Sequence, residues 1–380
     1  MDDCKRPTLL GFFFLNDWAI CPRVILSLIV AQGVTLQPMS RINRNDTLNL
    51  LSKLSARRAW NGIKVLASYY VSKWTKKPVQ WGFPISISFE PTTSCNLRCP
   101  ECPSGLRSFT RPTGMLQNDF FTKTIDQLQK ELLYLVFYFK GEPYLNPSFL
   151  NMVKYASSKR IYTATSTNAH YLNDANAKRT IESGLDRLII SIDGTTQESY
   201  QQYRVGGSLE KVLEGARNIV KWRTQLQSKT PFVVFQFLVV RHNEHQIEDV
   251  KKMAREIGVD DVWFKTAQVY DYENDPNHLI PTIDKYSRYR KTADGTVFKG
   301  KLANHCWRLW HDPVITWDGL VAPCCFDKDA QHQLGSLKEK SFKEIWKNGA
   351  YTEFRRQLLR GRKNIDICSN CSEGTKVWSN

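Results

Sequence analysis

The sequence predicts an α/β protein with a parallel sheet, either doubly wound or curled into a barrel, followed by a small cysteine-rich unit. After Pro84, short apolar runs alternate with helical stretches, and this alternation is typical of βα units with right-handed crossovers. The cysteines form clusters with C-x-x-C spacings, which are typical of metal sites. The chain has 380 residues, more than one core usually holds, so we expect more than one unit.

The composition indicates a folded protein with an unevenly distributed positive charge. Hydrophobic residues make up 42% of the chain, with eleven Trp and nineteen Phe, which excludes a disordered composition. Residues 1–79 contain twelve Lys or Arg and four Asp or Glu, a net +8 of the total +16. Such a patch suits RNA, anionic lipid or an acidic peptide, or is solvated surface. Clustered cysteines favour a reducing compartment, so we expect a cytoplasmic protein.

The first residues resemble neither a clear membrane span nor a folded unit. Residues 9–36 are apolar overall, but Asp17 and Arg23 interrupt them, so no run of about 20 apolar residues remains for a transmembrane segment. We expect residues 1–38 to be a gene-model extension or disordered, with Met39 as the true start.

Residues 39–80 are predicted to be a basic helical segment. The pattern indicates a helix over residues 46–74, with Asp46 or Thr47 as its N-cap and apolar residues at helical spacing, namely Ile63, Leu66 and Tyr70. We expect it to pack on the next domain rather than to bind a membrane surface or nucleic acid.

Residues 81–270 contain six predicted βα units. Strands are expected at 85–89, 135–139, 161–165, 188–192, 232–240 and 262–265. Helices are expected at 118–131, 147–157, 173–183, 209–224 and 246–257. Residues 271–304 read as a polar linker, and residues 305–380 as the cysteine-rich unit. In parallel sheets the ligand-binding loops lie at the carboxyl ends of the strands, where the polar motifs of this chain fall.

Three cysteines directly follow the first predicted strand. Cys95, Cys99 and Cys102 stand within eight residues with no fourth ligand beside them. Iron-sulfur clusters and structural zinc sites normally take four protein ligands, so this loop leaves one metal position open. A structural zinc knuckle is the alternative.

The C-x3-C-x2-C spacing resembles the signature of the radical S-adenosylmethionine (SAM) superfamily. The resemblance implies a partial (β/α)6 barrel and a 4Fe-4S cluster whose open iron binds the amino and carboxylate groups of SAM. It also implies reductive cleavage of SAM to a 5′-deoxyadenosyl radical, which abstracts a substrate hydrogen, with Cys95, Cys99 and Cys102 as the catalytic cysteines. One position departs from the family pattern, because Glu101 stands where an aromatic residue near the adenine is usual.

Further motifs supply candidate contacts to SAM. Gly141-Glu142-Pro143 resembles the family's Gly-Glu-Pro motif, which implies that the Gly141 carbonyl and the Glu142 carboxylate bind the amino group. Ser166 and Asn168 at the third strand end are expected to bind the carboxylate or the ribose. The resemblance to Ser-Ile-Asp-Gly members implies that two further residues engage the carboxylate, namely Ser191 and Arg204. Taken singly, each is equally well explained by turn chemistry.

A second cysteine cluster lies near the C-terminus. Gly319 precedes Cys324 by five residues, which suits a tight hairpin, and the cluster closes with a C-x-x-C pair. The spacing resembles the SPASM/twitch auxiliary domain, and five cysteines suffice for one auxiliary 4Fe-4S cluster. We expect its ligands to be Cys306, Cys324, Cys368 and Cys371, with Cys325 as the spare thiol. Either cysteine of the adjacent pair Cys324 and Cys325 could be the ligand. A zinc site is the alternative.

These features together predict a radical SAM enzyme that oxidises or modifies a peptide, protein or sugar-like substrate. It would need an electron donor such as flavodoxin or ferredoxin. Two alternatives remain: a non-catalytic iron-sulfur or electron-transfer module, and a radical SAM enzyme that acts on RNA, although a nucleic-acid partner is not favoured. The substrate itself is not predicted.

Overall fold

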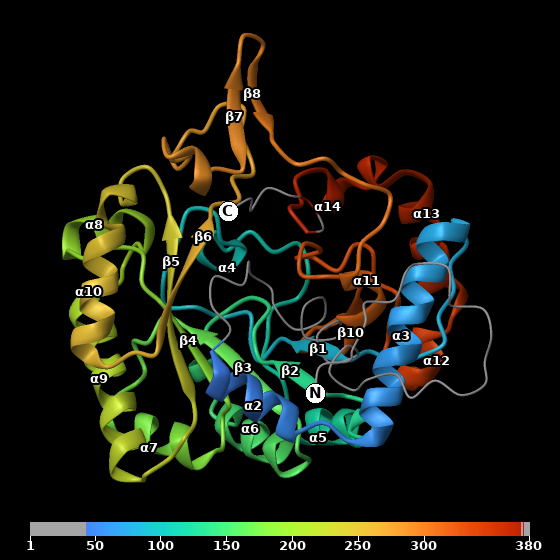
Figure 1. The fold of residues 1–380 in the computed structure, drawn as a ribbon, viewed down its shortest axis with the longest axis horizontal. Coiled ribbons are helices and arrows are strands. Elements are labelled where there is room, and N and C mark those ends of the chain that lie inside the picture. The colour runs from blue at the N-terminus through green and yellow to red at the C-terminus, as the bar shows by residue number, and fades with distance from the viewer. Residues whose placement is uncertain (1–42, 374, 376–380) are drawn as a thin grey trace, which may run out of the picture.

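The computed structural model describes residues 43–373 and 375, so the predictions for residues 1–38 and Met39 lie outside it. Within these residues the main sheet has nine strands, in the order β11-β10-β9-β1-β2-β3-β4-β5-β6. The six core strands are all parallel and follow chain order, which gives the predicted partial barrel (Figure 1). They are β1 (Ser86–Phe89), β2 (Tyr134–Val136), β3 (Tyr162–Thr167), β4 (Arg187–Ser191), β5 (Phe232–Val239) and β6 (Asp261–Thr266).

Most residues of these strands are apolar or β-branched, as expected of parallel strands covered by helices. Every residue of β1, β2 and β4 is buried. All six predicted strands are confirmed within three residues. The largest difference is in β2, which ends at Val136 because the chain then turns into the loop around Gly141, whose φ is +75°.

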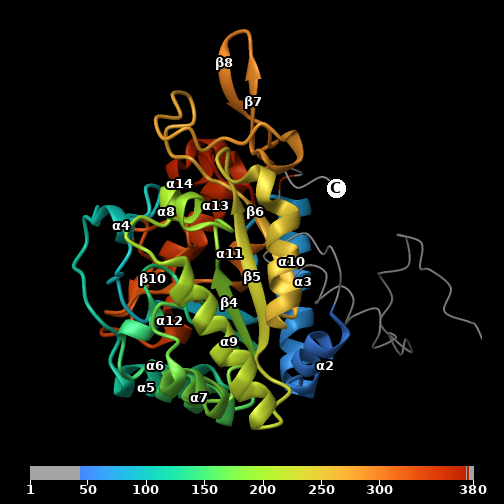
Figure 2. The same cartoon turned by 90° about the vertical axis from the view of Figure 1, so that its left-hand side faces the viewer.

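Helices lie on the outside of the barrel, and α9 and α10 run side by side in Figure 2. Side chains cap the first turns of α7 and α9: Asn173 accepts from Asn176 N, and Ser208 accepts from Lys211 N. The five predicted helices are confirmed within three residues at each end. The helices of this part are α4 (Pro103–Leu106), α5 (Asn118–Leu128), α6 (Phe149–Ser158), α7 (Asp174–Glu182), α8 (Gln197–Tyr203), α9 (Leu209–Gln225) and α10 (Ile247–Ile257).

The barrel is open, because β1 and β6 do not pair and the C-terminal unit continues the sheet beyond β1. β9 (Val314–Ile315) pairs with β1 in parallel, and β10 (Leu320–Ala322) and β11 (Gly335–Ser336) follow in antiparallel register. The auxiliary unit is therefore joined to the edge strand that leads into the first cysteine loop. Its helices are α11 (Arg308–His311), α12 (Phe342–Trp346), α13 (Gly349–Gly361) and α14 (Asp366–Ser369).

The single helix predicted over residues 46–74 is wrong, because the structure has two helices there, α2 (Arg44–Ser52) and α3 (Ala56–Thr75). Asn43 caps α2 and Ser55 caps α3. The Ser55 cap starts a new helix inside the stretch that the sequence predicts to be one continuous helix. The expected cap residue Asp46 lies buried within α2 instead, where it bonds to Tyr162 and Arg187.

Both N-terminal helices pack on the rest of the chain, as predicted. Asp46 contacts the first residues of β3 and β4, so α2 covers the amino ends of these strands (Figure 1). Tyr69 of α3 packs edge-on against Trp307 and Trp310 of the C-terminal unit.

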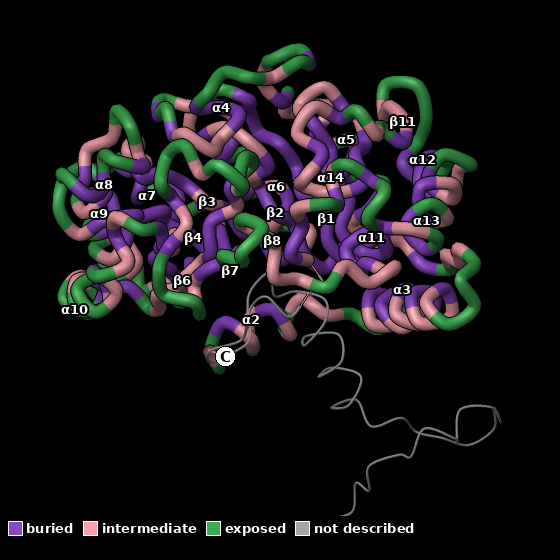
Figure 3. The backbone as a smooth tube through the Cα atoms, turned by 90° about the horizontal axis from the view of Figure 1, so that it is seen from above, coloured by how far each residue is buried: buried purple, intermediate pink, exposed green. Residues whose placement is uncertain are grey.

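The stretch predicted as a linker contains structure of its own. The hairpin of β7 (Tyr289–Thr292) and β8 (Gly295–Phe298) projects from the body of the molecule (Figure 1). Tyr289 at its base stacks on Tyr272. Seen from above in Figure 3, buried backbone runs through the central strands and exposed segments lie at the rim. Among the described helices, none is both long and apolar enough to cross a membrane.

Candidate iron-sulfur and cofactor site

The first cysteine loop runs from the carboxyl end of β1 to α4. Cys99 is buried, and Cys95 and Cys102 are partly buried and pack around the same apolar cluster. The chain turns tightly here, because Cys102 N donates to Cys99 O at 3.2 Å. All three thiols therefore lie on one loop at the end of the sheet where ligands bind.

Burial raises the pKa of Cys95 to about 11, with smaller contributions from Cys99 and Cys102, and it also raises the pKa of Cys99. Without a bound cation, three neighbouring thiolates would repel one another and destabilise the folded loop, whereas a bound metal stabilises the deprotonated form of each thiol. This donor set fits an iron-sulfur cluster, which binds one thiolate at each iron. Among the described residues, no three His, Cys, Asp or Glu side chains converge on a single-ion site.

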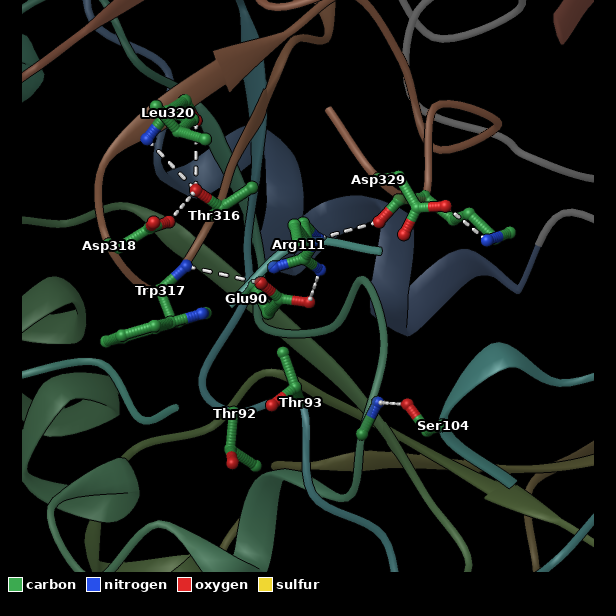
Figure 4. Close-up of polar contacts among 12 residues, drawn as sticks. Glu90, Thr92, Thr93, Ser104, Arg111, Thr316, Trp317, Asp318, Leu320 and Asp329 are labelled. Atoms are coloured by element: carbon green, nitrogen blue, oxygen red, sulfur yellow. Dashed lines mark hydrogen bonds and ion pairs between the residues drawn. The ribbon is translucent and has the colours of Figure 1, made fainter. Parts of the chain in front are cut away.

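The predicted Gly-Glu-Pro loop lies directly against the cysteine loop. Glu142 N donates to Ser94 O at 2.8 Å. Gly141 N donates to the hydroxyl of Ser104, which is labelled in Figure 4, at 2.8 Å. A Cβ on Gly141 would lie 2.1 Å from Thr92 O. Glycine is therefore required where the two loops meet.

Glu142 is buried, with its carboxylate held by the end of β3. Oε1 accepts from Thr167 Oγ1 at 2.7 Å, and Oε2 accepts from Asn168 N at 2.8 Å. Burial raises the pKa of the Glu142 carboxyl to about 7, although these hydrogen bonds favour the charged form. The group is thus a positioned acceptor whose charge changes near neutral pH.

The candidate residues at the ends of β3 and β4 are brought together in part. Asn168 Nδ2 donates to Asn96 Oδ1 at 2.8 Å and lies 3.8 Å from Cys95 Sγ. Ser166 Oγ lies 3.5 Å from Ser191 Oγ. Asn168 therefore contacts the cysteine loop directly, while the two serines face each other across neighbouring strands.

Arg204 approaches the cysteine loop from the end of α8. Its Nη1 lies 3.9 Å from Cys99 Sγ, and its Nε donates to Asp193 Oδ2 at 2.5 Å. Asp193 is itself fixed, because its other oxygen accepts from Leu238 N at 2.7 Å. Burial alone would lower the Arg204 pKa, but Asp193 and Cys99 raise it well above its usual value. One side of the guanidinium is thus held by Asp193, and Nη1 points to the cysteines.

Glu101 has a role that the sequence did not predict. Its Oε2 accepts from Tyr270 N at 3.0 Å, and its Oε1 from Asn277 Nδ2 at 3.5 Å. Burial raises the Glu101 pKa. The residue next to Cys102 therefore ties the cysteine loop to the segment after β6. Position 101 departs from the family pattern, and nothing in the sequence indicates its partners.

A buried ion pair links the start of the cysteine loop to the C-terminal unit (Figure 4). Glu90 follows β1 directly, and its carboxylate lies 2.5 Å from Arg111 Nη2. Its other oxygen accepts from Trp317 N at 3.3 Å, and Arg111 Nε donates to Lys328 O at 2.7 Å. No sequence pattern predicts this contact, because Arg111 lies in an aperiodic loop.

The five cysteines of the C-terminal unit come from three segments. Cys306 precedes α11, Cys324 and Cys325 follow β10, and Cys368 and Cys371 lie at α14. Buried Arg362 lies among three of these thiols: Cys306, Cys371 and Cys368 raise its pKa against the effect of burial. The eight cysteines in the described part of the chain are free thiols.

The adjacent cysteines have different surroundings. Burial raises the Cys324 pKa, and its neighbour Cys325 raises it further, followed by Cys371 and Cys368. Cys325 instead packs with an apolar group that includes Phe139 and Val314. Cys324 therefore lies close to the C-x-x-C pair as well as to Cys325.

Comparison with known proteins agrees with this site. Residues 89–254 match the radical SAM superfamily, and residues 306–372 match SPASM, an iron-sulfur cluster-binding domain. A parallel βα barrel with an open three-thiolate loop and a second cysteine-rich domain defines an iron-sulfur enzyme. The chain belongs to the radical SAM superfamily and carries a C-terminal SPASM domain. Its cofactors are accordingly a 4Fe-4S cluster, SAM and auxiliary iron-sulfur.

Several curated proteins are similar over most of their length. A tungsten-containing aldehyde ferredoxin oxidoreductase cofactor-modifying protein of Pyrococcus furiosus is 26% identical over 316 residues, covering 75% of this chain and 86% of its own. The PqqA peptide cyclase of Gluconobacter oxydans is 26% identical over 315 residues, which cover 78% of this chain and 84% of the cyclase. The mycofactocin maturase MftC of Mycobacterium ulcerans is 25% identical over 309 residues, covering 76% and 80%.

Solved structures share the fold. The SAM-bound structure of anSMEcpe aligns with a TM-score of 0.58 at 18% identity, covering 77% of this chain and 85% of its own. SAM-bound SuiB of Streptococcus suis aligns with a TM-score of 0.57 at 14% identity, and the alignment covers 80% of this chain and 74% of SuiB.

Proposed function

We propose that Cys95, Cys99 and Cys102 ligate the cluster at which this enzyme cleaves SAM. The observation that carries the proposal is the three-thiolate loop at the carboxyl end of β1, with donors from two other loops beside it: Asn168 Nδ2 3.8 Å from Cys95 Sγ and Arg204 Nη1 3.9 Å from Cys99 Sγ. When bound, the cluster and SAM together supply a one-electron cleavage that yields a 5′-deoxyadenosyl radical.

The surrounding residues would bind and orient the methionine end of SAM. Glu142 offers a fixed carboxylate as acceptor for the amino group, and the Gly141 carbonyl lies on the same loop. Arg204 would present Nη1 to the SAM carboxylate, because Asp193 already occupies its Nε. Asn168, Ser166 and Ser191 complete the polar lining from β3 and β4.

We propose that Cys306, Cys324, Cys368 and Cys371 hold one auxiliary 4Fe-4S cluster. Cys324 lies near enough to Cys368 and Cys371 for both thiols to raise its pKa, and Cys325 packs against an apolar group, which favours Cys324 as the fourth ligand. The adjacent pair offers matched variants: Cys324→Ser should lower iron from about eight to about four per chain, whereas Cys325→Ser should keep about eight. Iron analysis and absorbance near the thiolate-to-iron bands would measure this. Equal iron loss in both variants would contradict the assignment.

For the substrate, we propose a peptide. The supporting observation is the similarity, over 78% of this chain, to a protein named PqqA peptide cyclase. A flavodoxin or ferredoxin would supply the electron, and the free thiols agree with a reducing, cytoplasmic location.

One assay tests the enzyme assignment. The chain is reconstituted anaerobically with iron and sulfide, reduced with dithionite and incubated with SAM, and 5′-deoxyadenosine is measured. We expect the product from the wild type and from Cys325→Ser, and none from Cys95→Ala or Cys99→Ala. A fully loaded protein that forms no 5′-deoxyadenosine would support the non-catalytic iron-sulfur module instead.

A further inference from the structure

The helix α3 is amphipathic in the reverse sense to most surface helices. Its buried face is largely polar: Arg58, Asn61, Ser68 and Ser72 lie inside together with Gly62, Val65 and Tyr69. These polar groups form hydrogen bonds within the protein. Asn61 bonds to Phe83 through both its amide N and its amide O, and Ser68 Oγ accepts from Trp81 N at 2.8 Å. Polar contacts and the core side chains Val65 and Tyr69 therefore hold the inner side of α3, and this packing does not use the apolar stripe on the other side of the helix.

The outward face of α3 carries an apolar stripe. Its members follow the spacing i, i+3, i+7, i+11 and i+14, which places them on one side of a helix; they are Trp60, Ile63, Ala67, Val71 and Trp74. The side chains of Trp60 and Trp74 are 61% and 69% exposed, and Trp81 just beyond the helix is 51% exposed. At 1.5 Å per residue, the two helical indoles stand about 21 Å apart. Figure 3 shows α3 at the rim of the molecule.

Cations surround this stripe without acidic residues among them. Residues 56–77 contain six Lys or Arg and no Asp or Glu. Arg58 is buried and Arg57 pairs with Glu131 of the neighbouring element. The other four cations are Lys64, Lys73, Lys76 and Lys77. An apolar stripe with exposed indoles and flanking lysines is the pattern of a helix that lies in the interface of a membrane, where anionic headgroups meet the cations.

We propose that the outward face of α3 is a docking surface for a membrane that contains anionic lipid. Other occupants fit the charge less well. Residues 1–42 contain four Lys or Arg and three Asp, so they offer no net negative charge to neutralise the lysines. A second copy that used the same face would bring like charges together. Nucleic acid would match the cations, but the aliphatic centre of the stripe, Ile63, Ala67 and Val71, offers no stacking surface for bases.

The test uses the full-length chain with two kinds of vesicle, pure phosphatidylcholine and phosphatidylcholine mixed with phosphatidylglycerol. We expect co-sedimentation with the mixed vesicles only, weakening as salt increases. Replacing both helical indoles (Trp60→Ser with Trp74→Ser) should weaken binding about tenfold or more. Lys64→Glu with Lys73→Glu should weaken it similarly and reduce the salt dependence. Leu226→Ser, at an apolar residue exposed elsewhere on the surface, is the matched control and should bind as the wild type does.

Other outcomes would overturn the proposal. Unchanged vesicle binding in the double-tryptophan variant would assign binding to another segment, such as residues 9–36. If the wild type binds neither kind of vesicle but forms a dimer, and the double-tryptophan variant is monomeric, a second copy of the chain is the occupant. Binding to a polynucleotide in place of vesicles would identify nucleic acid. Because Trp60 and Trp74 make few internal contacts, thermal unfolding should be the same in all variants, which separates loss of binding from loss of fold.

Discussion

The carboxylate of Glu142 is expected to make SAM binding depend on pH. Burial raises its pKa to about 7, so the charged form increases as the pH rises from 6 to 8. The carboxylate is the better acceptor for the amino group of SAM, and affinity should therefore rise over this range. Glu142→Gln should bind SAM at least about tenfold more weakly, because it removes the charge and turns an amide N–H toward a backbone donor. Its affinity should also show less pH dependence. Equilibrium binding to the reconstituted protein measures both effects.

The matched control for Glu142 is Thr167→Val. This change leaves the carboxylate in place and removes the hydrogen bond from Thr167 Oγ1. Because that bond favours the charged form, its loss should raise the pKa and move the binding profile to higher pH. If the pH profile of SAM binding keeps its midpoint in Thr167→Val, another group controls the pH dependence. The same follows if the SAM affinity of Glu142→Gln changes with pH as steeply as that of the wild type.

Single residues were predictable from the sequence where the chemistry lies within one segment. Cys95, Cys99 and Cys102 are on one loop, and the open coordination position follows from counting ligands. Contacts between distant segments were not predictable. Nothing local indicates that Glu101 bonds to Tyr270, 169 residues away, or that Arg111 pairs with Glu90 and bonds to Lys328, 217 residues away. Such partners depend on how the loops of several βα units meet.

At the scale of elements, the loop after β2 should tolerate no side chain at Gly141. Its φ is +75°, and a Cβ there would lie 2.1 Å from Thr92 O. Gly141→Ala should cost at least about 2 kcal/mol of unfolding free energy and should displace the cysteine loop, so that less iron is bound at the first site. Gly349→Ala is the control, since nothing lies within 4 Å of its added Cβ. Denaturant unfolding and iron content in both variants test this. Full iron loading in Gly141→Ala would contradict it.

Elements with a strong period were predicted well, and those that depend on local capping or turns were not. The six strands and five outer helices follow from apolar periodicity. The break between α2 and α3 depends on the Ser55 side chain, which accepts from Arg58 N. The hairpin β7–β8 is not predicted although Asp294-Gly295 is a recognised hairpin signal, because each strand has only four residues, too few to show a period.

At the scale of the whole molecule, α2 contributes to stability through a buried ion pair with the barrel. Asp46 pairs with Arg187 and also bonds to the Tyr162 hydroxyl, and both charged side chains are buried. Asp46→Ala leaves the Arg187 cation without its partner and should lower the unfolding free energy by about 3 to 5 kcal/mol. Leu48→Ser, on the exposed side of the same helix, should change it by less than about 0.5 kcal/mol. Equal effects in the two denaturant curves would contradict this role for α2.

The pair Glu90 and Arg111 connects the radical SAM core to the SPASM domain, and its variants should show that the two parts depend on each other. Arg111→Met leaves the Glu90 carboxylate buried without a cation and should cost about 3 to 5 kcal/mol. Burial already raises the Glu90 pKa, and Arg111 opposes this. In Arg111→Met the folded state should therefore hold a proton that the unfolded state releases, so stability should fall as the pH rises from 5.5 to 8.

The double variant Glu90→Gln with Arg111→Met removes both charges at this contact and should recover most of the stability lost in Arg111→Met. Its amide can still accept the hydrogen bond that Trp317 N now donates to Glu90 Oε2. The contact with the SPASM domain is then kept while the pH dependence disappears. Denaturant unfolding at pH 5.5 and 8 for the wild type, the single and the double variants measures the coupling. If the double variant is as unstable as Arg111→Met at both pH values, the pair acts through packing on Phe109 and Phe139 and not through its charges.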